Sequence, residues 1–327
     1  MSKLYRRDFM KGAAALGVAA TSGLARPALA QQWPTQDLRF ICGYAPGSGA
    51  DLIVRHFSER VRKLSNANVI VENRTGAGGD LATEYVARAK PDGYTILIHG
   101  AGAVAGIMSL RKNPPIDTSK TLQMAATTHR QCFMVVVDTK SPYRTLDDLT
   151  KAMLAKGDKA SYGTNAIDGT VIGEIYKNVT GIKAQEVPYR VATDTLNDLS
   201  SGALDFCIHN PQLALSQHRE NRLRILGIGA NKRMISHPEF PTMTELGVPM
   251  NIQGWWCASV PTGSPTSAIN LINKWFVEIV NTEDTKKFLT DIGGDPLSLS
   301  PADTQALFMT EIDNWREKIR IAKITPQ

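Results

Sequence analysis

The sequence predicts an α/β protein with two domains, each built on a mainly parallel β-sheet flanked by helices. Short apolar, strand-like segments alternate along the chain with segments whose apolar residues have helical spacing. This alternation is typical of βαβ units, in which helices connect parallel strands and cover the sheet. The chain has 327 residues, which suits two domains of ordinary size after a signal peptide is removed.

The first 30 residues have the features of a cleaved export signal. Arg6 and Arg7 precede a short, weakly apolar segment, residues 12–24, as in twin-arginine signals. Ala28 and Ala30 supply the small-x-small pattern of a signal peptidase site, so the mature chain is expected to begin at Gln31 in the periplasm. An amphipathic helix and a membrane anchor are the alternatives, but the apolar segment falls short of the about 20 residues that span a bilayer.

The basic character of the chain comes largely from this segment. Removing residues 1–30 takes away five basic residues and one acidic residue, so the formal net charge falls from +6 to about +2. No run of Lys and Arg with interleaved aromatic residues remains. Nucleic acid is therefore not an expected partner.

Four cysteines lie far apart in apolar, strand-like segments: Cys42, Cys132, Cys207 and Cys257. No two of them have the close spacing of a zinc or thiol-redox site. We expect buried free thiols, with a Cys132–Cys257 disulfide as the alternative.

The first part of the mature chain predicts a βαβαβ arrangement. Strands are expected at residues 38–42, 69–71 and 95–99, and helices at 52–64 and 81–89. Turns rich in Gly separate the first strand from its helix and the second strand from the next helix.

A second set of elements follows, and the C-terminal part is mainly helical. Strands are expected at residues 135–137, 161–162, 186–187, 203–208, 223–228 and 252–260, and helices at 146–155, 171–180, 194–201, 269–280, 282–292 and 301–322. Extended crossings near 132–138 and 253–260 are expected to form a hinge. The expected division is residues 31–134 and 254–327 in lobe 1, and 135–253 in lobe 2.

The turn GYAPGSGAD, residues 43–51, is a candidate anion site. It lies between a strand and a helix, so its N–H groups converge at a helix N-terminus, where the helix dipole favours negative charge. Ser48 adds a hydroxyl donor. Dinucleotide binding is disfavoured because Leu52 stands where the third Gly of G-x-G-x-x-G belongs. A plain turn, with Asp51 capping the helix, is the alternative.

The motifs PGSGAD, VENRTGAGGD and PDGYTIL follow one another in an order and spacing that resemble one family. These are the substrate-binding proteins of tripartite tricarboxylate transporters, often called the Bug family. The resemblance continues through EVPYR, GALDF, NP, GWW and PTGSP, and so covers essentially the whole mature chain.

The resemblance implies a fold and a function. Family members are similar to type II periplasmic binding proteins, in which two α/β lobes joined by two crossing strands close like a Venus flytrap on a ligand. It implies a monomeric solute-binding protein, without cofactor or catalysis, that delivers a small organic carboxylate to membrane subunits of the transporter. That carboxylate would be a di- or tricarboxylate or an aromatic acid. A ligand sensor and a periplasmic enzyme on the same scaffold are the alternatives.

Carried over position by position, the resemblance implies ligand contacts from both lobes. In lobe 1 these are Tyr44, Ala45, Gly47, Ser48, Gly49, Gly102 and Ala103; in lobe 2 they are Thr164, Asn165, Gly169, Thr170, Arg190, Val191, Ala192, His209 and Asn210.

Several of these residues depart from the family pattern, so the resemblance does not fix the ligand. Tyr44 replaces Phe, Ser48 replaces Gly, and Arg190-Val191-Ala192 stands where Lys-Gly-Gly is usual. Arg190 suits a second carboxylate, or it pairs with Asp194 at the surface. His209 either donates to the ligand or ends a strand.

The remaining candidates argue against chemistry at this site. Trp255 and Trp256 suit hinge and core packing, with one facing the cleft as the alternative. No G-x-S-x-G or H-E-x-x-H motif occurs, and the six histidines do not recur at metal-ligand spacing. We therefore expect no catalytic residue and no metal.

Overall fold

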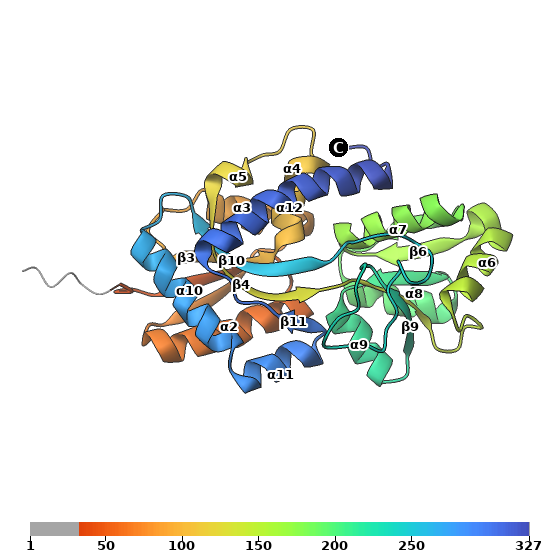
Figure 1. The fold of residues 1–327 in the computed structure, drawn as a ribbon, viewed down its shortest axis with the longest axis horizontal. Helices are drawn as coiled ribbons and strands as arrows, with labels where there is room; N and C mark the ends of the chain where they lie inside the picture. Colours follow the sequence, from red (N-terminus) through yellow and green to blue (C-terminus); the bar gives the residue numbers. More distant parts are fainter. Residues whose placement is uncertain (1–32, 327) are drawn as a thin grey trace, which may run out of the picture. The chain divides into compact units, whose positions relative to one another are not determined.

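The computed structural model describes residues 33–326, and in this part of the chain helices flank two β-sheets (Figure 1). This confirms the predicted α/β class. The predicted signal peptide and its cleavage site lie outside the described residues. Within those residues, no helix combines the length and the apolar character that crossing a membrane requires.

The first sheet has six strands among the described residues, in the spatial order β11-β4-β10-β3-β1-β2. They are β1 (Leu38–Cys42), β2 (Val69–Asn73), β3 (Thr95–Gly100), β4 (Leu122–Gln131), β10 (Gly254–Pro261) and β11 (Gly294–Pro296). Strand β1 pairs in parallel with β2 and with β3, as the βαβαβ prediction requires.

The second sheet has five strands in the described part of the chain, in the order β7-β6-β8-β5-β9. They are β5 (Met134–Asp138), β6 (Ser161–Thr164), β7 (Gln185–Pro188), β8 (Phe206–His209) and β9 (Leu223–Ile228). Strand β4 leads almost directly into β5, so the chain passes from one sheet to the other within a few residues (Figure 1).

The described helices cover both sheets. They are α2 (Gly49–Ser65), α3 (Asp80–Ala87), α4 (Ala101–Leu110), α5 (Thr118–Thr121), α6 (Leu146–Lys156), α7 (Ile167–Thr180), α8 (Thr195–Ser201), α9 (Pro211–Arg219), α10 (Thr266–Val280), α11 (Glu283–Asp291) and α12 (Pro301–Ala322), with short 3-10 turns η1 (Ala77–Gly79), η2 (Gly157–Lys159) and η3 (Ala192–Asp194).

Both sheets are mixed rather than mainly parallel, which corrects that part of the prediction. In the first sheet β10 runs antiparallel to β3 and to β4, and β11 runs antiparallel to β4. In the second sheet β5 runs antiparallel to β8 and to β9, whereas β6 pairs in parallel with β7 and β8. The reason is connectivity: β4 leaves the first sheet for the second and β10 returns, so the two must run in opposite directions.

Packing against the sheets fixes the helices that carry the site. Helix α2 buries Ile53, Phe57 and Val61, and the Phe57 ring stacks on Phe276 of α10 with ring centres 5.0 Å apart. Helix α12 packs on α4 and reaches α7 (Figure 1). Burial of these apolar faces supplies most of the stability that holds the loops at the strand ends in place.

The four cysteines are free and buried, as expected, and the alternative Cys132–Cys257 disulfide is not formed. Burial raises the pKa of the Cys42 thiol to about 11 and the pKa of the other three thiols to about 12.

Candidate functional site

Two adjoining cavities lie where loops from the two sheets face each other. The first has a volume of about 410 Å³ and is lined by Tyr44, Ala45, Pro46, Gly47, Ser48, Gly49, Ala50, Leu52, Gln131, Phe133, Asn165, Ala166, Arg190, Val191, Ala192, Thr193, Asn210, Gln212, Leu213, Ser216 and Trp256. Most of these residues follow the carboxyl ends of strands, where α/β folds bind ligands.

The second cavity has a volume of about 400 Å³. Tyr44, Asn165 and Ala166 line both cavities, so the two share a wall. The other residues of the second cavity are Gly78, Asp80, Ala103, Ile107, Leu110, Arg111, Ile167, Asp168, Thr170, Glu186, Pro188, Ile324 and Thr325.

Three helix N-termini meet at the first cavity. Helix α2 begins at Gly49, α7 at Ile167 and α9 at Pro211, and residues at each of these starts line the cavity or cap its helix there. Each N-terminus presents unpaired N–H groups and the positive end of a helix dipole. Of the described residues that line this cavity, only Arg190 carries a formal charge. The cavity is therefore electrostatically suited to an anion.

The turn before α2 is built by its own side chains. Ser48 is the N-cap, and its hydroxyl accepts from the N–H of Asp51 at 3.2 Å. The Asp51 carboxylate accepts from the N–H of Gly47 at 2.8 Å, from Arg55 and from Asn73. Burial alone would raise the pKa of Asp51, but these hydrogen bonds lower it overall.

This arrangement decides which donors of the turn remain for a ligand. The N–H of Gly47 already serves Asp51, and the Asn73 side chain also holds the carbonyl of Tyr44 at 2.9 Å. The N–H groups of Gly49 and Ala50, in the first turn of α2, are the ones left unpaired by the helix geometry. Asp51 thus supports the turn, whereas Ser48, rather than Asp51, caps the helix.

On the second sheet, the structure uses two predicted donors internally. The hydroxyls of Thr164 and Thr170 both donate to Oε1 of Glu186 at 2.5 Å. Thr164 is buried and lines neither cavity, whereas Thr170 lines the second. Their shared role is to tie α7 to the neighbouring β6 and β7.

The loop after β7 reaches the first cavity as predicted. Arg190, Val191 and Ala192 all line it, and Arg190 is exposed. In the described part of the chain Arg190 forms no ion pair with Asp194, so the alternative surface pairing is not seen. Asn210 also lines the cavity, and its side chain caps α9 by accepting from the N–H of Leu213 at 3.0 Å.

Three predicted residues lie behind the walls rather than on them. Gly102 and Gly169 are buried and line neither cavity. His209 is fully buried, its Nε2 lies 2.9 Å from the Thr195 hydroxyl, and burial lowers its pKa to about 4. His209 therefore contacts another side chain of the fold, rather than a ligand or the backbone. Ala103 lines the second cavity.

A stack of aromatic rings forms the floor on the first-sheet side. Tyr44 stacks on His99 at 4.8 Å between ring centres, and Trp256 lies between His99 and His129 at 5.9 Å from each. Trp256 faces the first cavity, whereas Trp255 does not line it. These rings come from the turn after β1 and from the neighbouring strands β3, β10 and β4, so only the folded sheet brings them together.

The glycine-rich second motif makes room for this stack. Gly79 has a φ of +107°, and a Cβ there would lie 2.3 Å from Nε2 of His99. A glycine is required here by both the backbone conformation and the close approach of the imidazole.

Sequence analysis missed several wall residues, chiefly Gln131, Phe133 and Gln212 from the first cavity and Asp168 from the second, whereas Trp256 fits the alternative in which one tryptophan faces the cleft. The Gln212 amide donates to Oε1 of Gln131 at 2.9 Å, joining α9 to the end of β4. The contact spans 81 positions of sequence, so no local pattern could indicate it.

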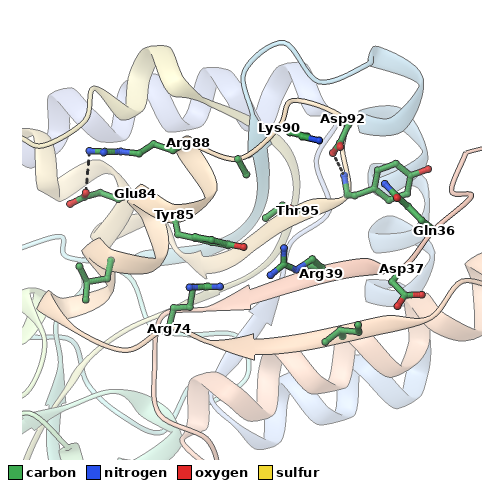
Figure 2. A pocket seen from close by; sticks show the side chains of 14 residues that line it. Gln36, Asp37, Arg39, Arg74, Glu84, Tyr85, Arg88, Lys90, Asp92 and Thr95 are labelled. Atoms are coloured by element: carbon green, nitrogen blue, oxygen red, sulfur yellow. Dashed lines mark hydrogen bonds and ion pairs between the residues drawn. The ribbon is translucent and has the colours of Figure 1, made fainter.

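A larger groove of about 1090 Å³ lies elsewhere, beside β1, β3 and α3 (Figure 2). Arg39 and Arg74 lie against the Tyr85 ring, with the Arg74 guanidinium carbon 3.5 Å from the ring centre. Both arginines pair with Glu72, and Arg88 pairs with Glu84. Its described lining residues all precede residue 96. The groove thus lacks any contribution from the second sheet, and much of its charge is neutralised internally.

The chain was compared with known proteins. The model of the family described as "Tripartite tricarboxylate transporter family receptor" matches residues 53–324. The chain belongs to this family. The family identified from the sequence motifs is therefore confirmed.

Relatives of this receptor match it along nearly its whole length. Protein BugT from Bordetella pertussis is 26% identical over 305 residues, which cover 92% of this chain and 94% of BugT. The structure of Rpa4515 from R. palustris with adipate is 25% identical, with a TM-score of 0.85, and covers 90% of this chain and 100% of its own. MatC from Rhodopseudomonas palustris with bound malate shares the fold at 21% identity and a TM-score of 0.80, covering 88% of this chain and 100% of its own.

Proposed function

We propose that this receptor is a periplasmic solute-binding protein that captures a small organic carboxylate between two lobes and delivers it to membrane subunits of a tripartite tricarboxylate-type transporter. Lobe 1 comprises residues 31–134 and 254–327, and lobe 2 comprises residues 135–253. The observation that carries the proposal is the convergence of three helix N-termini and Arg190 on one cavity of about 410 Å³. That volume suits a small acid.

Binding would use hydrogen-bond donors held in fixed positions, and the ligand would not react. The N–H groups of Gly49 and Ala50 and the Arg190 guanidinium are the donors proposed to hold a carboxylate. Asn165 and Asn210 line the opposite wall and are proposed to orient the ligand. Closing the lobes would exclude water and so strengthen each of these interactions.

Two structurally similar proteins were solved with small carboxylate ligands, which supports this proposal. Rpa4515 was solved with adipate and MatC with malate, and both compounds are small dicarboxylates. The departures at Tyr44, Ser48 and Arg190 lie in the cavity wall, so we do not extend either ligand to this chain.

A thermal-shift screen of the mature protein against mono-, di- and aromatic carboxylates tests the function. A ligand that binds only the folded state adds about 2.7 kcal/mol at a hundredfold excess over Kd, which raises Tm by several degrees. At least one carboxylate should stabilise the protein, and its amide or alcohol analogue should not. Hits confined to sugars or metal ions would contradict the proposal, and turnover of a hit would indicate an enzyme instead.

A further inference from the structure

Two carboxylates of the second cavity form no ion pair in the described structure, Glu186 and Asp168, and of these Asp168 is the one without a hydrogen bond from another side chain. Asp168, in the first turn of α7, lines this cavity. The other two acidic residues of the wall are already engaged: Asp80 accepts from Arg111 at 2.8 Å, and Glu186 accepts from two threonine hydroxyls. Asp168 has no comparable partner.

Lys318 is the basic residue whose charge acts on Asp168, but its ion pair is with Glu311. Lys318 donates to Glu311 at 2.6 Å and lies 5.0 Å from the Trp315 ring centre, and it forms no ion pair with Asp168. Loss of hydration raises the pKa of Asp168 to about 6, only partly offset by Lys318. Near neutral pH the side chain is therefore still mostly ionised. Asp168 is half-buried, and a partly dehydrated carboxylate without an ion-pair partner is costly, so this site favours a cation that would compensate it.

The position of Asp168 places it beside the first sheet. A Cβ at Gly102, in the first turn of α4, would lie 3.1 Å from Oδ1 and 3.3 Å from Oδ2 of Asp168. The carboxylate thus extends from a helix of the second sheet to a helix of the first. Gly102, which the sequence assigned to the ligand, instead makes room for this side chain.

The two cavities consequently have opposite electrostatic character. The first combines three helix N-termini with Arg190, and the second contains the uncompensated carboxylate of Asp168. Because Tyr44, Asn165 and Ala166 line both, the two cavities adjoin, and an elongated ligand with unlike ends would match their opposite character.

We propose that Asp168 makes this receptor select carboxylates that also carry a cationic nitrogen, with the carboxylate in the first cavity and the ammonium group against Asp168. This inference rests on the proposed function, since it names the ligand class of the same site. The negative charge of Asp168 in the first turn of α7 also interacts favourably with the dipole of that helix. A purely structural role of that kind would change stability but not ligand preference.

The test compares compounds that differ only at one end. Calorimetry on the mature protein would use 6-aminohexanoate, adipate, hexanoate and 6-hydroxyhexanoate, together with the corresponding series from four to eight carbons. At some chain length the amino acid should bind at least about tenfold more tightly than the matched diacid and monoacid, equivalent to about 1.4 kcal/mol. Asp168→Asn should remove this preference.

A matched control is Glu174→Gln, which removes one negative charge from the same helix but lines neither cavity. It should keep the wild-type preference. Wild-type protein that binds diacids or monoacids as tightly as the amino acids, or an Asp168→Asn variant that keeps the preference, would overturn this inference alone. Failure of every carboxylate in the series and in the wider screen would overturn the proposed function as well. If Asp168→Asn does not fold, the affinities of the wild-type protein for the amino acids, diacids and monoacids still test the inference.

Discussion

Gln212 donates a hydrogen bond to Gln131 in the wall of the first cavity, 2.9 Å between nitrogen and oxygen. The same Gln212 also packs against Gly49, where an added Cβ would lie 2.6 Å from the Gln212 Cβ. Gln212 therefore joins the start of α9 to the end of β4 and to the start of α2. The space left by Gly49 is what lets the two helix starts approach.

Gly49→Ala should consequently weaken ligand binding by at least about tenfold, or about 1.4 kcal/mol, because the new methyl group keeps α2 and α9 apart. The free energy of unfolding should also fall, because a Cβ 2.6 Å from the Gln212 Cβ forces the two helix starts to shift. Calorimetry with the ligand from the screen and urea unfolding measure the two quantities. The double variant with Gln212→Gly, which removes the clashing Cβ, should recover part of the affinity; unchanged binding in Gly49→Ala would show that this contact is not needed.

Ser48→Asp should abolish carboxylate binding and leave the fold intact. Asp is as good an N-cap as Ser, so α2 remains capped, but a negative charge then faces the ligand. Like-charge contact of this kind costs several kcal/mol, so the loss should exceed about a hundredfold. Ser48→Asn is the matched control, because Asn caps equally well without the charge and should bind. Equal affinities for the two variants would remove this turn from the site.

Gly79→Ala should destabilise the protein far more than Gly78→Ala does. Both glycines have positive φ, but a Cβ at Gly79 would clash with His99, whereas a Cβ at Gly78 meets nothing within 4 Å. The backbone conformation alone costs about 1–2 kcal/mol, and the clash adds to it only at Gly79. Urea unfolding of the two variants measures the difference. Equal destabilisation would mean that His99 moves aside without cost.

Acid should destabilise the ligand-free protein well before general carboxylate protonation. Burial lowers the pKa of four histidines from 6.5 to about 4, namely His56, His99, His129 and His209. As the pH falls through 6.5, the unfolded chain therefore binds protons that the folded chain does not, and stability is lost down to about pH 4.

Asp168 acts in the opposite direction, because its raised pKa makes the folded chain bind a proton first. The effect of this one carboxyl group is outweighed by that of the four histidines. The free energy of unfolding, measured in urea from about pH 7 to about pH 4.5, should fall, and Asp168→Asn should steepen the fall. A constant or rising free energy would contradict this prediction.

Export remains a prediction from the sequence. Replacing both Arg6 and Arg7 with Lys should leave the precursor in the cytoplasm, because the paired arginines are the recognised feature of the signal. Cell fractionation with an antibody against the mature chain provides the measurement. Mature protein in the periplasm at wild-type levels would refute twin-arginine export.

The alternation of strands and helices was predictable because most elements alternate apolar and polar positions; β1, β9 and α12 have the predicted ends. Helix α4 was missed because it is apolar on nearly every side, so it lacks a helical period, and three glycines interrupt or precede it. The strand direction in the mixed sheets depends on how β4 and β10 connect the sheets, which no local pattern encodes.

The site residues that could be predicted are those in the turns directly after strands. The turn from Tyr44 to Gly49 follows β1 of the first sheet and the Arg190–Ala192 loop follows β7 of the second. Both were predictable because α/β folds bind ligands at the carboxyl ends of their strands. Asp168 was missed because α7 begins at Ile167, four residues before the apolar pattern at Val171. An Asp in a first helical turn was the available signal. Trp256 and Gln212 reach the wall only through long-range pairing.

The buried cysteines make the native chain a silent background for spectroscopic labelling. A thiol reacts as its thiolate, and these four are inaccessible, with a pKa of about 11 to about 12. Cysteines introduced at exposed Lys63 of α2 and Lys151 of α6 would be modified selectively, without replacing any native cysteine. A pair of probes at these two positions would then report the separation of the two sheets in solution, molecule by molecule, as a ligand is added.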